Sequence, residues 1–161
     1  MCAGYGSHIP ILSKYLSYLH QTIEKPRILE LGIGWYSTPV IQMMGGVTYP
    51  GSTPFEWRSE LLRITYAYSI TNQTCLSKEW DFIFVDSWPE DSRVKFVLQL
   101  LDKCPTFMLH DSNDDWEPSM QYSVVKGHFK YVKNYELFYP NTMILSQNPI
   151  PDLQLFSGEL G

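Results

Sequence analysis

The sequence predicts one α/β domain built on a doubly wound, mostly parallel sheet. Short apolar segments recur along the chain without polar alternation, as in strands covered on both faces, and amphipathic segments with helical periodicity lie between them. The 161 residues also fit one domain with a full-sized core, because a domain typically holds roughly 100–200 residues. We expect that domain to span 1–161, with an N-terminal helix within 1–25 and an irregular tail over 148–161.

The first elements in chain order are a helix, a strand and a second helix. Ser7 can cap a helix over about 9–24, where apolar residues recur at helical spacing. Ile28–Leu31 is a short apolar strand. Thr38 and Pro39 are typical of an N-cap and a first helical residue, and the helix they open should end at the two glycines that follow.

The remaining elements alternate in the same way. The weaker ones are a strand over Val47–Tyr49, a helix over Phe55–Tyr66 and a strand over Tyr68–Thr71. The clearest strands are Trp80–Asp86 and Thr106–Asp111, with a helix over Arg93–Lys103 between them. The segments FKYVKNYELFY and NTMILS predict an antiparallel pair that completes the sheet. Ligands of such sheets bind at the carboxyl ends of the strands.

Composition and charge exclude several classes of function. The formal net charge is −5, and the Lys and Arg residues are scattered, so no basic stripe is available for a nucleic acid. No apolar run approaches the ~20 residues that cross a bilayer, and no basic segment leads into a signal core. The three cysteines lack metal-ligand spacing and suit reduced thiols. We expect a cytoplasmic protein that binds neither nucleic acid nor membrane.

A glycine turn follows the first strand. Gly32 and Gly34, with Ser37 three residues on, form a G-x-G-x-x-S pattern between a strand and a helix. Backbone N–H groups at such a turn point toward a ligand over the helix N-terminus, although a turn without a ligand would use glycine as well. A nicotinamide site would require an acid ~20 residues further on, and Glu56 fits a capping box instead.

The segment ELGIGWYST resembles the first motif of class I S-adenosylmethionine-dependent methyltransferases. In that family an acidic residue ends the first strand, and the G-x-G loop wraps the methionine and ribose parts of the cofactor. The similarity continues through WDFIFVDSWPEDSR and TFMLHDSND and covers roughly 7–146. The whole pattern is similar to a compact methyltransferase-like group, and VDSW with the acid after the last parallel strand also resembles metal-dependent O-methyltransferases of the catechol type.

The resemblance implies S-adenosylmethionine as the cofactor. The candidate cofactor-binding residues are Glu30, Gly32, Gly34, Trp35, Ser37, Thr38 and Asp86. Two departures from the family pattern stand out. Gly51-Ser52-Thr53 replaces the acid expected after the second strand, and Asp111 is followed by Ser112 before Asn113, whereas the metal-dependent enzymes have Asn directly after that Asp.

Asp86 and Asp111 each end an apolar strand, and the two strands should be neighbours. Two carboxylates that meet at a strand-end crevice repel, so one of them takes up a proton or a cation lies between them. With Asn113 they would supply hard oxygen ligands suited to Mg²⁺, Mn²⁺ or Ca²⁺, and we expect Mg²⁺ or Mn²⁺ as the ion. The alternative is that Asp86 caps the following turn and Asp111 binds loop amides.

Two histidines are candidates near this crevice. His110 can act as a general base at neutral pH, but neighbouring strand residues point to opposite faces, so His110 and Asp111 share the crevice only if the strand has ended there. A buried structural histidine is the alternative. His8 precedes the first helix and either reaches over the cofactor loop or is a solvated capping residue.

These observations lead to one expected activity and two alternatives. We expect S-adenosylmethionine-dependent O-methyl transfer to a small molecule or glycan, with Asp111, His110 and Asp86 as catalytic residues. The alternatives are a lyase or hydrolase that cleaves the cofactor and a non-catalytic cofactor-binding module. We expect no capping domain beside a sheet of this size, and the acceptor site would then be shallow, be completed by a second subunit or take part of a larger molecule. The Tyr-rich segment 131–139 is a strand pair or a homo-oligomer surface.

Overall fold

The structure, a computed structural model, describes residues 6–50 and 72–155. Within them, six strands form one sheet in the order β2-β1-β3-β4-β6-β5. The strands are β1 (Ile28–Leu31), β2 (Val47–Tyr49), β3 (Phe82–Val85), β4 (Thr106–His110), β5 (Tyr131–Tyr135) and β6 (Thr142–Ser146). Strands β1 to β4 pair in parallel, and β6 runs antiparallel to both β4 and β5. The predicted α/β class with an antiparallel last strand is confirmed.

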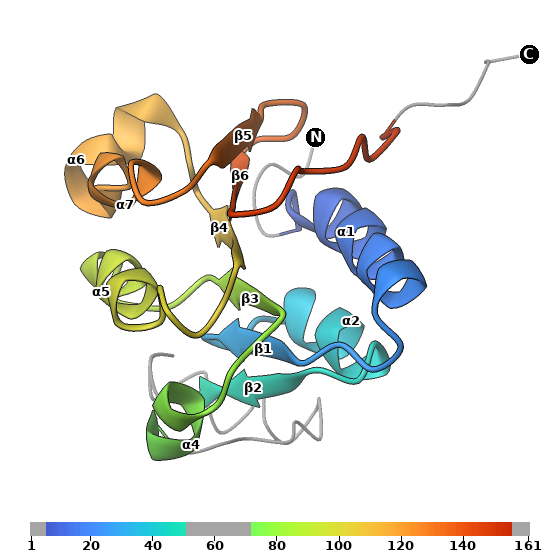
Figure 1. The fold of residues 1–161 in the computed structure, drawn as a ribbon. Coiled ribbons are helices and arrows are strands. Elements are labelled where there is room, and N and C mark those ends of the chain that lie inside the picture. Colours follow the sequence, from blue (N-terminus) through green and yellow to red (C-terminus); the bar gives the residue numbers. More distant parts are fainter. Residues whose placement is uncertain (1–5, 51–71, 156–161) are drawn as a thin grey trace, which may run out of the picture.

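Helices cover both faces of the sheet (Figure 1). One face carries α1 (Ile9–Thr22) and α2 (Ser37–Met43), and the other carries α4 (Asn72–Ser77), α5 (Asp91–Gln99), α6 (Glu117–Met120) and α7 (Ser123–Lys126), with the short helix η2 (Asp114–Trp116) ahead of α6. Each face has its own apolar core because successive strand residues point to opposite sides. In β3, for example, Phe82 and Phe84 pack toward α1, whereas Ile83 and Val85 pack toward α5.

Two predicted helix caps are wrong. His8 occupies the N-cap position of α1, and the hydroxyl of Ser7 instead donates to the carbonyl of Pro140 at 2.9 Å. Helix α2 begins at Ser37, so Thr38 lies inside its first turn and Tyr36 is the N-cap. Both hydroxyls therefore have partners that local sequence does not reveal, because those partners are held in place by other elements.

The other boundaries agree with the prediction to within a few residues. Helix α5 runs over Asp91–Gln99 instead of 93–103, and the Tyr-rich segment contributes strand β5, which pairs with β6 as expected. The helix predicted over 55–66 and the strand over 68–71 lie outside the described residues. In the described part of the chain, no helix is both long and apolar enough to cross a membrane.

Glycine at position 32 brings the ends of β1 and β3 together. Its φ is +88°, and a Cβ atom at Gly32 would lie 2.5 Å from the carbonyl oxygen of Asp86. Any side chain would collide with that backbone, and the left-handed φ adds strain for any residue with a Cβ. The glycine turn and the strand-end aspartate are therefore adjacent at the carboxyl edge of the sheet.

Candidate active site

The carboxylate of Glu30 lies beneath the glycine turn and is fully buried. It accepts hydrogen bonds from the hydroxyls of Ser37 at 2.5 Å, Thr38 at 2.8 Å and Thr48 at 2.8 Å. Burial raises the pKa of Glu30 to about 7, and the three hydroxyl donors act in the opposite direction. Through these hydrogen bonds Glu30 connects β1 to α2 and to β2. The side chains of Ser37 and Thr38 are therefore engaged in holding α2 against β1.

The two aromatic residues that follow the turn are exposed. The backbone N–H of Gly34 donates to Thr38 Oγ1 at 3.0 Å, which fixes the bend. Trp35 and Tyr36 follow it with 46% and 54% of their surface exposed. Large aromatic rings in water at a strand-end turn are suited to stack on a planar ligand. The structure therefore places Gly34 and Trp35 at the surface and Glu30 below it.

Asp86 and Asp111 are brought together across the ends of β3 and β4 by Arg93 of α5. The guanidinium donates to Asp86 Oδ1 at 2.9 Å and to Asp111 Oδ2 at 2.9 Å. Burial alone would raise the pKa of Asp86, but the charges of Arg93 and His110 outweigh it and hold that pKa well below its usual range. The buried guanidinium supplies the positive charge that two neighbouring carboxylates require.

Arg93 is itself anchored by backbone and phenol oxygens. It also donates to the carbonyls of Ser87 at 3.0 Å and His110 at 2.9 Å and to the hydroxyl of Tyr122 at 3.2 Å. Tyr122 donates in turn to the carbonyl of His110 at 2.7 Å. The sequence prediction missed Arg93 and Tyr122 as site residues. Arg93 carried a usable signal, because it stands seven residues after the strand-end Asp86 at the start of a helix.

Strand β4 ends at His110, and this allows two consecutive side chains to share the crevice. Asp111 has a φ of +59°, in the left-handed region, so it no longer follows the alternation of the strand. His110 Nδ1 consequently lies 3.5 Å from Asp86 Oδ2 and 3.3 Å from Asp111 Oδ1. The strand therefore ends early enough for His110 and Asp111 to face the same crevice, which is the arrangement that the sequence analysis required for His110 to join the site.

His8 is buried against His110 and is not a solvated capping residue. Only 2% of its surface is exposed, and its ring lies 4.9 Å from that of Phe84 and 4.4 Å from that of His110, centroid to centroid. Burial and the neighbouring His110 lower the pKa of His8 to about 3, so its ring is neutral. Neither ring nitrogen has a hydrogen-bond partner.

Asn113 is hydrogen-bonded to the segment that leads into β6. Its side-chain oxygen accepts a hydrogen bond from the backbone N–H of Asn141 at 2.8 Å, which holds the approach to β6. Ser112, between Asn113 and Asp111, donates to the side-chain oxygen of Asn134 at 2.5 Å. The structure therefore brings together Asp86, Asp111 and His110 and leaves Asn113 in a connecting role.

A pocket of about 560 Å³ opens over this cluster. Its floor carries Asp86, Arg93, His110 and Asp111, and its walls carry Trp88, Trp116, Met120 and Tyr139. Trp116 and Tyr139 meet edge to face with ring centroids 5.8 Å apart. This volume is within the range of small-molecule sites, roughly 300–1,000 Å³. An apolar wall over a charged floor can hold a ring and orient a polar substituent on it.

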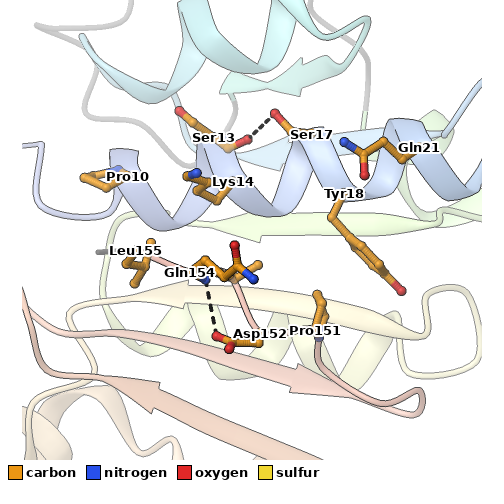
Figure 2. A pocket seen from close by; sticks show the side chains of 11 residues that line it. Pro10, Ser13, Lys14, Ser17, Tyr18, Gln21, Pro151, Asp152, Gln154 and Leu155 are labelled. Carbon is orange, nitrogen blue, oxygen red and sulfur yellow. Dashed lines mark hydrogen bonds between the residues drawn. The ribbon is translucent and has the colours of Figure 1, made fainter. Parts of the chain in front are cut away.

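A second cavity, of about 650 Å³, lies between α1 and the segment after β6 (Figure 2). Its lining includes Lys14, Tyr18 and Asp152, and the hydrogen bonds drawn there are local, from Ser17 to the carbonyl of Ser13 and from the Gln154 N–H to Asp152. It contains none of the predicted site residues. Although this cavity is larger, the candidate catalytic and cofactor-binding residues lie at the carboxyl edge of the sheet.

Solved structures of methyltransferases resemble this chain at low sequence identity. An O-methyltransferase from Bacillus cereus in complex with SAH is 18% identical, with a TM-score of 0.52, over 85% of this chain and 81% of that chain. The O-methyltransferase TomG from Streptomyces achromogenes, involved in tomaymycin synthesis and solved with SAM, is 15% identical, with a TM-score of 0.52, over 89% and 87%. Monomeric WbdD is 11% identical, with a TM-score of 0.61, over 95% of this chain and 44% of that chain.

No protein-family model matches the sequence, and no curated protein is similar enough to match. The structural likeness establishes the fold: the chain has the Rossmann-like α/β fold of class I S-adenosylmethionine-dependent methyltransferases. Within that class, the two O-methyltransferases from Bacillus cereus and Streptomyces achromogenes match this chain over most of their own length as well.

Proposed function

We propose that the protein transfers a methyl group from S-adenosylmethionine to a hydroxyl oxygen of a small molecule or of a sugar in a glycan. One observation carries the proposal: two strand-end carboxylates, held on one guanidinium, form the floor of an aromatic-walled pocket beside the glycine turn. The O-methyltransferase fold of the structural neighbours supports it.

The residues at the turn fit the cofactor. Gly32 is in contact with the backbone of Asp86, and Asp86 also lines the pocket, so the turn and the pocket are neighbours at the same edge of the sheet. The exposed ring of Trp35 stands at the same edge. Here Gly32, Gly34 and Trp35 would contact the cofactor, and Glu30, Ser37 and Thr38 would hold the turn in shape from below. When bound, the cofactor supplies an activated methyl group on a sulfonium.

The protein must then hold the acceptor oxygen in line and remove its proton. We assign proton removal to Asp111, whose Oδ1 faces His110 and not the guanidinium. Arg93 fixes the orientation of both carboxylates, and His110 is the reserve base. The aromatic walls exclude water and take up the flat face of an aromatic ring or the apolar face of a sugar.

The predicted Mg²⁺ or Mn²⁺ site on Asp86, Asp111 and Asn113 fits the structure poorly. One oxygen of each carboxylate is used by Arg93, and the side-chain oxygen of Asn113 is used by Asn141.

The test is an incubation with methyl-labelled S-adenosylmethionine and a panel of phenols, catechols and sugars, followed by mass spectrometry of all products. Methyl ethers and S-adenosylhomocysteine in equal amounts are expected. Release of methylthioadenosine or homoserine products without an acceptor would instead identify a lyase or hydrolase. Cofactor binding without any product would identify a binding module.

A further inference from the structure

A second candidate metal site lies in the interior of the active site and includes nitrogen ligands. One ligand atom from each of His8, Asp86 and His110 can be chosen so that all three lie within 4.8 Å of one another. His8 and His110 are buried, and Asp86 is partly exposed where it lines the pocket. The three residues come from the start of α1 and from the ends of β3 and β4, so the tertiary structure alone brings them together.

The buried side chain of His8 indicates a ligand. Both of its ring nitrogens are buried without a hydrogen-bond partner. Leaving a buried polar atom unpaired costs about 1–3 kcal/mol, and a phenylalanine in the same stack against Phe84 would avoid that cost. A neutral imidazole with a free lone pair, buried beside a carboxylate and a second imidazole, is the arrangement of a metal ligand.

The hydrogen bonds of Ser7 orient His110 for the same purpose. Ser7 has one hydroxyl proton and donates it to the carbonyl of Pro140, so its oxygen accepts from Nε2–H of His110 at 3.0 Å. The other ring nitrogen, Nδ1, faces Asp86 Oδ2 at 3.5 Å and Asp111 Oδ1 at 3.3 Å. A metal ion can take the place of a proton on this nitrogen while Nε2–H keeps its bond to Ser7. Metal-bound histidines characteristically donate their second N–H to an oxygen in this way.

Arg93 leaves room for such a cation. It occupies Oδ1 of Asp86 and Oδ2 of Asp111, on the side of α5, while Asp86 Oδ2 is turned toward His110. The two carboxylates and the guanidinium sum to one negative charge, so a divalent ion leaves one positive charge at the floor of the pocket. Water in the open pocket can solvate that charge.

We propose that His8, Asp86 and His110 bind a divalent first-row transition metal ion such as Zn²⁺. Two imidazoles and one carboxylate favour such ions over Mg²⁺, which prefers oxygen ligands. Metal–ligand bonds of about 2.0–2.2 Å bring ligand atoms to roughly 3.4 Å from one another, so the His110–Asp86 pair is already close to that spacing and the ring of His8 closes the remainder. The site shares Asp86 with the oxygen-ligated candidate on Asp86, Asp111 and Asn113 but takes its other two ligands from histidines.

The test measures metal binding alone, with no cofactor or acceptor present, so it stands independently of the proposed methyl transfer. Tag-free, chelator-treated protein is titrated with Zn²⁺ by calorimetry and with Co²⁺ by visible absorption. One equivalent of each ion should bind, and Co²⁺ should give the strong visible bands of a low-coordinate site with nitrogen ligands. Absence of saturable binding, or only the weak bands of six-coordinate Co²⁺ with oxygen ligands, would overturn the proposal.

Three variants identify the ligands. His8→Phe keeps the ring stacked on Phe84 and should weaken Zn²⁺ binding at least about tenfold, as the loss of a ligand does, while its thermal unfolding without metal shows whether it folds. His20→Phe, on the exposed side of α1, is the matched control and should bind as the wild type does. Asp111→Asn removes a nearby charge but no proposed ligand, so it should weaken binding less than His8→Phe does. If Asp111→Asn loses binding and His8→Phe retains it, the ion belongs to the carboxylates and the proposed site is wrong.

Discussion

Asp86 and Asp111 are bridged by one guanidinium, since Arg93 donates to one oxygen of each at 2.9 Å. The second oxygen of each carboxylate is turned toward His110. Removing the buried positive charge of Arg93 would leave the two negative carboxylates close together without compensation, in a poorly solvated place.

Replacing Arg93 by Met should therefore destabilise the protein by roughly 3–5 kcal/mol, the range for breaking a buried ion pair. Urea unfolding followed by circular dichroism measures this change. Lys95→Met is the matched control on the same helix: Lys95 pairs with Asp91 at the surface, and such pairs contribute about 0–1 kcal/mol. Equal effects of the two substitutions would contradict the bridging role of Arg93.

Asp111→Asn should abolish methyl transfer and leave cofactor affinity within a few-fold. The reason is that Asp111 lies on the floor of the acceptor pocket, whereas Gly32 and Gly34 form the turn at the end of β1. Calorimetry with S-adenosylhomocysteine and a single-turnover assay give the two quantities separately. Asp115→Asn, an exposed neighbour, is the control. If the Asp111 variant loses both binding and turnover, this carboxylate belongs to the cofactor site or to the fold.

Gly34→Val should weaken cofactor binding strongly. A Cβ at Gly34 already lies 3.0 Å from Ser37 Oγ, and the two methyl groups of valine would fill the outer side of the turn, where the ligand needs close approach to the backbone. Calorimetry compares the variant with the wild type. Gly127→Val is the control, because a Cβ there meets nothing within 4 Å. Unchanged affinity in Gly34→Val would place the cofactor elsewhere.

Glu30 should make stability fall as pH rises. Its pKa is raised from 4.5 in the unfolded reference to about 7 in the fold, so between those values the folded protein keeps a proton that the unfolded chain has lost. The free energy of unfolding then decreases with pH, by up to about 1.4 kcal/mol per pH unit in that window. Glu30→Gln removes this dependence. The free energy of unfolding of Glu30→Gln, minus that of the wild type, should therefore be larger at pH 8 than at pH 5.

Denaturant unfolding at pH 5 and pH 8 tests this prediction. Glu24→Gln serves as the control, because Glu24 is an exposed residue just beyond the end of α1. Parallel stability curves for Glu30→Gln and the wild type would show that Glu30 keeps the same charge in both states, and would remove the pH dependence assigned to its burial.

The order and type of the elements follow from the sequence alone. Uninterrupted apolar runs such as Phe82–Val85 and Phe107–Leu109 are typical of strands covered by helices on both faces, so they predict central parallel strands. The glycine pattern after Ile28–Leu31 predicted a turn at the carboxyl edge, and the positive φ of Gly32 shows why glycine is needed there. These signals are local, since each depends on residues within one element and its neighbours.

The partners of the polar side chains were decided only by the tertiary structure. The sequence placed Asp86 and Asp111 at neighbouring strand ends but could not show that Arg93 lies between them, because that contact depends on how α5 packs over the sheet. The same holds for Glu30, whose hydroxyl partners lie seven to eighteen residues away, and for Ser7, which contacts His110 across 103 residues. Apolar burial is set by periodicity along the chain, whereas a buried polar group needs a specific partner in space, and only the folded chain supplies it.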